Sequence, residues 1–174
     1  QTAISELTGL PVSNASVYEG PSALAAAGYL ARLHHPERTR FLVSRGVHPH
    51  SRETLATTSV GWGTTIEELP LAGGATDADA LAEALGDDVS AVFLQYPNFL
   101  GAVEDLEALV PAAKAAGALV IVQCDPIPLG ILRPPGDFGV DVAVGEGQSL
   151  GNRLDFGGPS FGFFAAQDAY VRRM

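Results

Sequence analysis

The chain has 174 residues, a net charge of −10 at pH 7 and a hydrophobic fraction of 47%. This length suits one domain with one core, and so high an apolar content excludes an intrinsically disordered chain. The acidic balance argues against a nucleic-acid partner, because binding phosphates requires a basic face.

The sequence gives no sign of export or of membrane insertion. No apolar run reaches the roughly 18 residues that a membrane-spanning helix needs, and the first residues, QTAISELTG, lack the features of a signal peptide. Cys124 is the only cysteine, which excludes an internal disulfide and fits a reducing compartment. We therefore expect a cytoplasmic protein with no membrane association.

Helical segments and short apolar runs alternate along the chain. In chain order, we expect a helix at 22–35, a strand at 41–44, a helix at 50–60, a weaker strand at 64–71, a helix at 77–86, a strand at 91–97, a helix at 104–117, and strands at 118–124, 141–145 and 161–166. Pro21 suits a first helical turn, Thr76 or Asp77 suits an N-cap, and Gly86 and Gly117 suit helix ends.

This alternation predicts an α/β fold. Strands that are apolar on both faces and are joined by helices form a mostly parallel sheet with helices on both faces, in three layers. The pattern leaves the direction of the strand at 161–166 open. The prolines of 128–139 indicate a rigid loop, so residues 1–174 are expected to form a single domain. The start at Gln1 and the helix-like end AYVRRM lead us to expect a piece of a longer chain.

Polar side chains follow several of the expected strands. In open α/β sheets, ligands bind at the carboxyl ends of the strands, and a parallel sheet would bring these residues to one rim: His48, Asn98, Asp125, Glu146 and Gln148. Three of them also have an ordinary interpretation: His48 as a surface histidine, Asn98 as a turn residue and Asp125 as a loop cap. Cys124 is expected to be a buried strand residue.

The segment SNASVYEGP (13–21) leads into the first expected helix. Free backbone N–H groups and the helix dipole at that helix start would suit an anion such as phosphate. The sequence contains no metal-ligand cluster, no phosphate-loop lysine motif and no dinucleotide glycine fingerprint. We therefore expect no metal site.

Five stretches carry a resemblance to a known family: residues 4–27, 44–52 (SRGVHPHSR), 92–109 (VFLQYPNFLGAVEDLEAL), 125–151 (DPIPLGILRPPGDFGVDVAVGEGQSLG) and 156–166 (FGGPSFGFFAA). They resemble subunit 1 of the glycine cleavage system P-protein, the decarboxylating glycine dehydrogenase. This family has the large-domain fold of pyridoxal-phosphate (PLP) transferases of fold type I. Its members are more than twice as long as this chain, so the chain is similar to the central part of that large domain.

The resemblance implies an activity and partners. The complete enzyme would decarboxylate glycine with PLP and pass the aminomethyl group to the lipoyl arm of H-protein. It also implies that Asn14, Ala15 and Ser16 stand at the phosphate cradle. His48 would stand near the ring-stacking position, and Asp125 at the position of the pyridinium partner.

Two further positions follow from the resemblance. Asn98 would stand near the substrate side, and the position of the Schiff-base lysine is held by Gln148 or a neighbour, which cannot form an imine. The only lysine, Lys114, lies in an expected helix. The resemblance thus implies no catalytic residue in this chain and no covalently bound PLP. The chain would be an oligomeric partner of a lysine-bearing subunit 2, and the glycines of 147–158 would allow close packing against that partner.

Two alternatives stay open. The chain could be a structural or regulatory subunit that has kept the fold without catalysis. It could also belong to a different PLP enzyme, such as a decarboxylase or an aminotransferase, against which the missing lysine counts.

Overall fold

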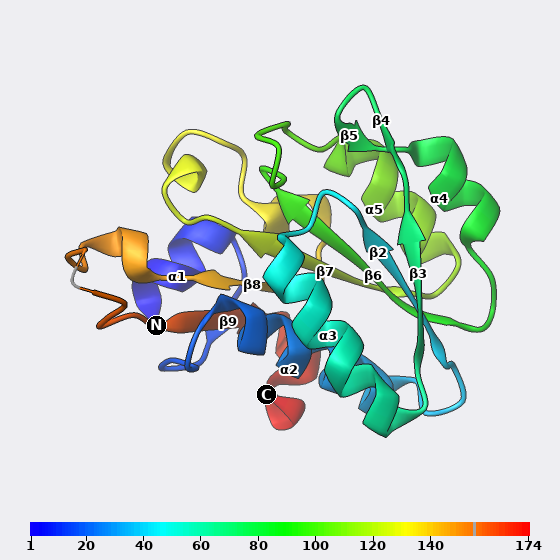
Figure 1. The fold of residues 1–174 in the computed structure, drawn as a ribbon, viewed down its shortest axis with the longest axis horizontal. Helices are drawn as coiled ribbons and strands as arrows, with labels where there is room; N and C mark the ends of the chain where they lie inside the picture. The colour runs from blue at the N-terminus through cyan, green and yellow to red at the C-terminus, as the bar shows by residue number, and fades with distance from the viewer. Residues whose placement is uncertain (155) are drawn as a thin grey trace.

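A computed structural model describes residues 1–154 and 156–174 (Figure 1). Its helices are α1 (Thr2–Thr8), α2 (Gly20–His34), α3 (Pro49–Trp62), α4 (Ala78–Ala84) and α5 (Leu106–Ala115). Its strands are β1 (Val12–Ser13), β2 (Arg40–Ser44), β3 (Thr65–Leu69), β4 (Leu71–Ala72), β5 (Ala75–Thr76), β6 (Val89–Tyr96), β7 (Leu119–Cys124), β8 (Val142–Glu146) and β9 (Gly162–Ala166). Four short 3-10 helices complete it: Pro128–Gly130, Pro135–Phe138, Gln148–Leu150 and Asp168–Arg173.

The main sheet has seven strands in the order β1-β9-β8-β7-β6-β2-β3. The five strands from β8 to β3 run parallel, and β9 runs antiparallel to both of its neighbours, β8 and β1. Strands β4 and β5 form a separate small hairpin. The mostly parallel sheet confirms the prediction, and the antiparallel direction of β9 settles what the pattern left open.

Helices cover both faces of the sheet, so the predicted three layers are present (Figure 1). Alternate residues of each central strand point to opposite faces. In β6, Phe93 joins the core under α2 and α3, and its neighbour Leu94 joins the core under α1, α4 and α5. Because both faces are buried, these strands consist of almost continuous apolar runs.

The expected helices and strands are found with shifted ends. Helix α4 ends at Ala84, and its cap Leu85 is extended, so the prediction that Gly86 ends this helix was wrong. Helix α5 begins two residues later than expected, because the Asp105 side chain caps it by accepting from the N–H of Ala108. Helix α1 and the β4–β5 hairpin were not predicted, since both are too short to show a period.

Two glycines at the end of β8, Gly145 and Gly147, serve the chain's own packing. A Cβ atom on Gly147 would lie 2.2 Å from the ring of Phe161, and one on Gly145 would lie 2.1 Å from the backbone oxygen of Cys124. Gly151 has a φ of 114°, which L side chains rarely adopt. Close packing within the chain therefore accounts for Gly145 and Gly147 without a partner.

A buried carboxylate, that of Asp141, holds several elements together at the amino end of β8. Asp141 is 3% exposed and accepts hydrogen bonds from the ammonium of Lys114 (2.5 Å), the backbone N–H of Val120 (2.8 Å) and the hydroxyl of Tyr170 (3.0 Å). These contacts tie α5, β7 and the last 3-10 helix to one strand start. In the described part of the chain, no helix has both the length and the apolar character needed to cross a bilayer.

Candidate functional site

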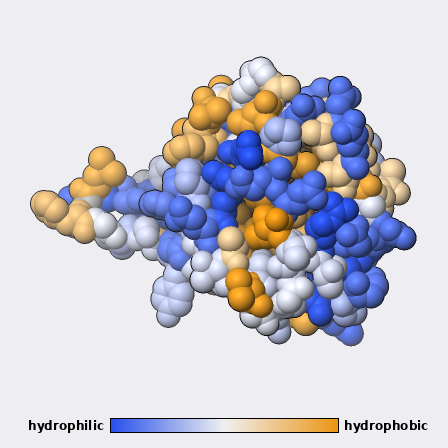
Figure 2. Space-filling view, turned by 45° about the vertical axis from the view of Figure 1, so that its right-hand side comes forward, coloured by the Kyte–Doolittle hydropathy of each residue, from blue (hydrophilic) through white to orange (hydrophobic). Residues whose placement is uncertain are grey.

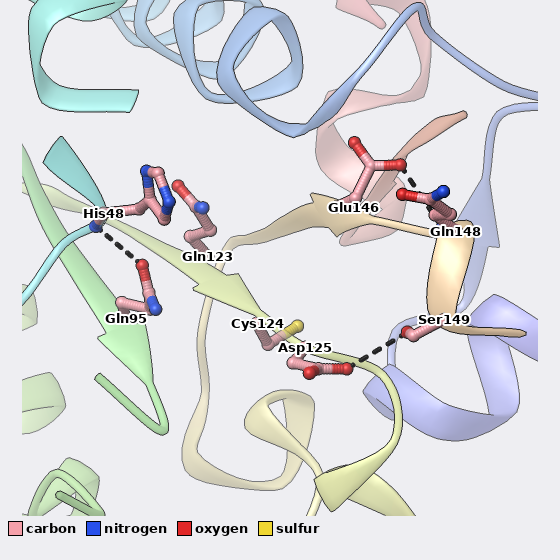
Figure 3. A pocket seen from close by; sticks show the side chains of 8 residues that line it. All are labelled: His48, Gln95, Gln123, Cys124, Asp125, Glu146, Gln148 and Ser149. Atoms are coloured by element: carbon pink, nitrogen blue, oxygen red, sulfur yellow. Dashed lines mark hydrogen bonds between the residues drawn. The ribbon is translucent and has the colours of Figure 1, made fainter. Parts of the chain in front are cut away.

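A cavity of about 280 Å³ lies at the carboxyl ends of β6, β7 and β8. Its lining brings together residues that are distant in the sequence: His48, Gln95, Gln123, Cys124, Asp125, Glu146, Gln148 and Ser149 (Figure 3). The parallel sheet thus brings four of the five predicted residues, His48, Asp125, Glu146 and Gln148, to one rim, as the position of ligand sites in α/β sheets predicts.

His48 reaches the cavity from the start of α3. Its backbone N–H donates to Oε1 of Gln95 (2.8 Å), and its Nδ1 accepts from the N–H of His50 (3.2 Å). The ring lies edge-on to Phe99, with centroids 4.7 Å apart. Partial burial, followed by the charge of His50, lowers the pKa of the imidazole. The His48 ring is therefore held between the first turn of α3 and the loop after β6.

Asp125 follows β7, and its carboxylate is held by two neighbours. Oδ1 accepts from the backbone N–H of Ile127 (3.0 Å) and from the hydroxyl of Ser149 (3.2 Å). The second contact joins the ends of β7 and β8 across the mouth of the cavity (Figure 3). Asp125 is exposed, so its other oxygen is accessible to a ligand.

Glu146 is the last residue of β8, and its side chain reaches the start of α2. Its Oε2 accepts from the N–H of Gly20 (3.0 Å), and its Oε1 accepts from the N–H of Gln148 (3.2 Å). The first turn of α2 is completed by Glu19, whose side chain accepts from the N–H of Ser22 (2.9 Å) and whose carbonyl accepts from the N–H of Ala23 (3.0 Å). Pro21 has no N–H to offer. The expectation of free N–H groups for an anion at this helix start was therefore wrong, because the chain's own carboxylates fill the position.

Asn98 lies apart from the residues that line the cavity. It is 4% exposed, and its carboxamide donates to the carbonyl of Gly74 and to Glu104, and accepts from the N–H groups of Leu100 and Ala102. All four contacts hold the loop between β6 and α5. The expectation that Asn98 joins His48 and Asp125 at one rim was therefore wrong, because its carboxamide is used up in anchoring a loop. Its position near the substrate side of the complete enzyme stays a prediction.

Asn14, Ala15 and Ser16 lie between β1 and α2. The side chain of Asn14 donates to the carbonyl of Ser16 at 3.5 Å, and its buried Oδ1 has no partner. Ser16 lines a second, more open cavity of about 610 Å³ together with Ser22, Phe161 and neighbouring residues. These three residues are therefore not gathered with His48 and Asp125 around one cavity, and their role in binding phosphate stays a prediction.

The rim does not fit a covalently held phosphate-bearing cofactor. The side chains at the end of β8, Gln148 and Ser149, cannot form an imine. Lys114 is bound to Asp141 at the start of β8. Because a five-residue strand extends about 16 Å, this lysine lies far from the cavity at the other end of β8. Where a phosphate would gain most from a helix start, Glu19 and Glu146 present negative charge instead.

Sequence reasoning did not single out Gln95, Gln123 or Ser149. Gln95 and Gln123 each stand near the end of an apolar strand and are partners in the β6–β7 register. A polar residue at the same place in two neighbouring buried strands was the available signal. Among the described residues, 1–154 and 156–174, no group of three or more histidine, cysteine, aspartate or glutamate side chains is arranged to hold a metal.

Comparison with known proteins places the chain among a defined group. The family description "Glycine cleavage system P-protein" matches residues 1–174. The chain is 48% identical to a probable glycine dehydrogenase (decarboxylating) subunit 1 from Geotalea daltonii, and 48% identical to that from Moorella thermoacetica. Each match covers 100% of this chain and 39% of the relative, so the chain spans about two fifths of the length of these relatives.

Solved structures give the same result. A crystal structure of a glycine decarboxylase (P-protein) of the glycine cleavage system, in inhibitor-bound form, superposes with a TM-score of 0.92 at 48% identity, over 99% of this chain and 38% of that one. The cysteine desulfurase CsdA of Escherichia coli superposes with a TM-score of 0.77 at 17% identity, over 99% of this chain and 43% of that one. The second likeness concerns the fold alone, and it agrees with the large-domain type of fold-type-I PLP enzymes.

Proposed function

Because the chain belongs to the P-protein family of the glycine cleavage system, we propose that it forms the central part of subunit 1 of a decarboxylating glycine dehydrogenase. Residues 1–174 would fold as one unit, which is the central part of the large domain of the complete subunit. In the complete, cytoplasmic enzyme, glycine is decarboxylated with PLP and the aminomethyl group passes to the lipoyl arm of H-protein. The contribution of this chain is to the assembly and not to cofactor anchoring.

The observation that carries this role is the position of the only lysine. Lys114 is bound to a 3%-exposed carboxylate at the start of β8, whereas the cavity opens at the end of that strand. A PLP enzyme needs an amine at its cofactor, and this chain offers none at the rim. The imine lysine of the complete enzyme is therefore assigned to subunit 2.

Exposed apolar side chains support an assembly with another subunit. They occur in loops that follow the carboxyl ends of the strands: Phe99, Leu100 and Val103 after β6, Ile127 and Ile131 after β7, and Leu154 and Phe156 between β8 and β9. Figure 2 shows a projecting segment with hydrophobic side chains at its tip. Apolar surface of this kind promotes association, so we expect a dimer or a larger assembly in solution.

Two other functions account for the same fold. A structural or regulatory subunit would bind the partner without affecting its chemistry. A different PLP enzyme would need an amine at the rim, which the position of Lys114 disfavours. The identity of 48% to subunit 1 relatives over the full chain favours the glycine cleavage role.

Reconstitution separates these functions. The purified chain is combined with a lysine-bearing subunit 2 and H-protein, and the exchange of labelled bicarbonate into the carboxyl group of glycine is followed. We expect no exchange from the chain alone, and exchange that depends on its presence in the mixture. Exchange by subunit 2 that is unchanged when the chain is left out would support the structural subunit, and exchange by the chain alone would support a complete enzyme.

A further inference from the structure

The cavity at the ends of β6, β7 and β8 has a one-sided charge. Asp125 and Glu146 both line it, and no lysine or arginine does. Neither carboxylate forms an ion pair with any residue in the described part of the chain. Their hydrogen-bond donors are the neutral N–H groups of Ile127, Gly20 and Gln148 and the hydroxyl of Ser149. Two negative charges therefore face one small space without a neighbouring cation.

A separate observation points to a ligand there. Gln123 is 9% exposed, and its Oε1 is buried without a hydrogen-bond partner. Figure 3 shows its side chain reaching from β7 into the space between His48 and Glu146. An unsatisfied buried acceptor costs about 1–3 kcal/mol, so such groups normally have a donor. The missing partner of Gln123 is thus a donor.

From this arrangement we propose that the cavity binds a small molecule that carries a primary ammonium group and no anionic group. The ammonium has three N–H donors and a positive charge, which matches a buried amide oxygen and two carboxylates that line the same cavity. The space of about 280 Å³ lies near the lower end of the range of small-molecule pockets, roughly 300–1,000 Å³, so the ligand is small.

The same geometry rejects anions. A phosphate or carboxylate in the cavity would face Asp125 and Glu146, and the N–H of Gly20 at the start of α2 is already bound by Glu146. Glycine and PLP both carry an anionic group, so this site is additional to the glycine site of the complete enzyme. The proposed ammonium ligand would thus occupy the cavity of a subunit that has no lysine to form an imine with PLP.

Titration of the isotope-labelled chain with 2-aminoethanol, followed by NMR, tests the site. The side-chain amide signals of Gln123 and Gln95 are expected to shift in a saturable manner. Glu146→Gln and Asp125→Asn should each raise the dissociation constant about tenfold or more, as the loss of a charge-assisted hydrogen bond predicts. Both substitutions keep the side-chain shape, and circular dichroism checks that each variant is folded.

Asp87→Asn is the matched control, because it removes one negative charge from an exposed position away from the cavity. It should leave the dissociation constant unchanged, and inorganic phosphate should cause no shift of the Gln123 signals. Three results would overturn the proposal: no saturable shift with 2-aminoethanol, a wild-type dissociation constant in the Glu146→Gln and Asp125→Asn variants, or saturable binding of phosphate in the cavity.

Discussion

Lys114 and Asp141 form an ion pair at 2.5 Å where β8 begins, at the opposite end of the strand from Gln148. The side chain of Asp141 is 4% exposed and that of Lys114 is 42% exposed. The only lysine of the chain is therefore paired at the amino end of β8, while the cavity opens at the carboxyl ends of the strands. Substitutions at the ion pair can therefore test stability, and substitutions at the cavity can test ligand binding, independently of each other.

Asp141→Asn should lower the free energy of unfolding by about 3 kcal/mol, because the substitution removes the buried partner of a cation and places an amide N–H₂ against donors. Urea denaturation followed by circular dichroism measures this change. Lys114→Met is the milder counterpart, with an expected loss of about 1 kcal/mol, since the lysine side chain is partly solvated. A loss below about 0.5 kcal/mol for Asp141→Asn would refute the role of Asp141 as the organising group.

Tyr170 predicts a loss of stability in alkali. Burial, followed by the charge of Asp141, raises the pKa of its hydroxyl above the ordinary value of 10.0. The unfolded chain then loses the phenol proton at a lower pH than the folded chain. The stabilisation is complete below pH 10 and decreases as the pH rises above it.

Denaturation between pH 8 and pH 11.5 checks this dependence. Tyr170→Phe should flatten the decrease above pH 10, whereas Tyr18→Phe, at a 91%-exposed position, should leave it unchanged. Burial also raises the pKa of the Cys124 thiol, so part of the decrease remains in the Tyr170→Phe variant. An identical pH profile for wild type and Tyr170→Phe would contradict the prediction.

Gly147→Ala should destabilise the chain by about 1–3 kcal/mol, because the new methyl group would overlap the ring of Phe161. The double variant Gly147→Ala, Phe161→Leu should recover part of that loss. Gly61→Ala is the control: it lies in α3 with nothing within 4 Å of the added Cβ, and it should gain about 0.5–1 kcal/mol. If Gly147→Ala is as stable as wild type, packing within the chain does not explain this glycine.

Asn98→Ala should lower the free energy of unfolding by about 2–3 kcal/mol, since four hydrogen bonds of a buried carboxamide are lost. Thermal unfolding compares it with Asn152→Ala, whose one side-chain bond is exposed and which should change little. An Asn98→Ala variant that is as stable as wild type, with unchanged NMR chemical shifts in the loop between β6 and α5, would argue against an anchoring role.

The strands and helices of the sheet were predictable because their patterns are local. A run such as ALVIVQC is apolar on both faces, which is typical of a strand in a sheet that is covered on both sides. The roles of Asn98 and Glu146 depend on contacts that the sequence pattern does not reveal. Glu146 meets Gly20 across 126 residues, and Asn98 meets Glu104 and the hairpin loop at Gly74.

The candidate site was predictable in part. His48, Asp125 and Gln148 follow strand ends or a helix start, so topology alone gathers them. Gln95 and Gln123 lie inside strands, where a single polar residue has no local signature. The anion expectation failed because a helix start attracts any carboxylate that can reach it, and here Glu146 is supplied by the end of β8.

The central claim is that this chain does not anchor PLP and depends on a lysine-bearing partner. Its most direct test is to incubate the chain with PLP, alone and with subunit 2, reduce with borohydride, and map the adducts by mass spectrometry. The account predicts no stoichiometric adduct on Lys114 in either sample and an adduct on a lysine of subunit 2. Stoichiometric labelling of Lys114 would contradict it.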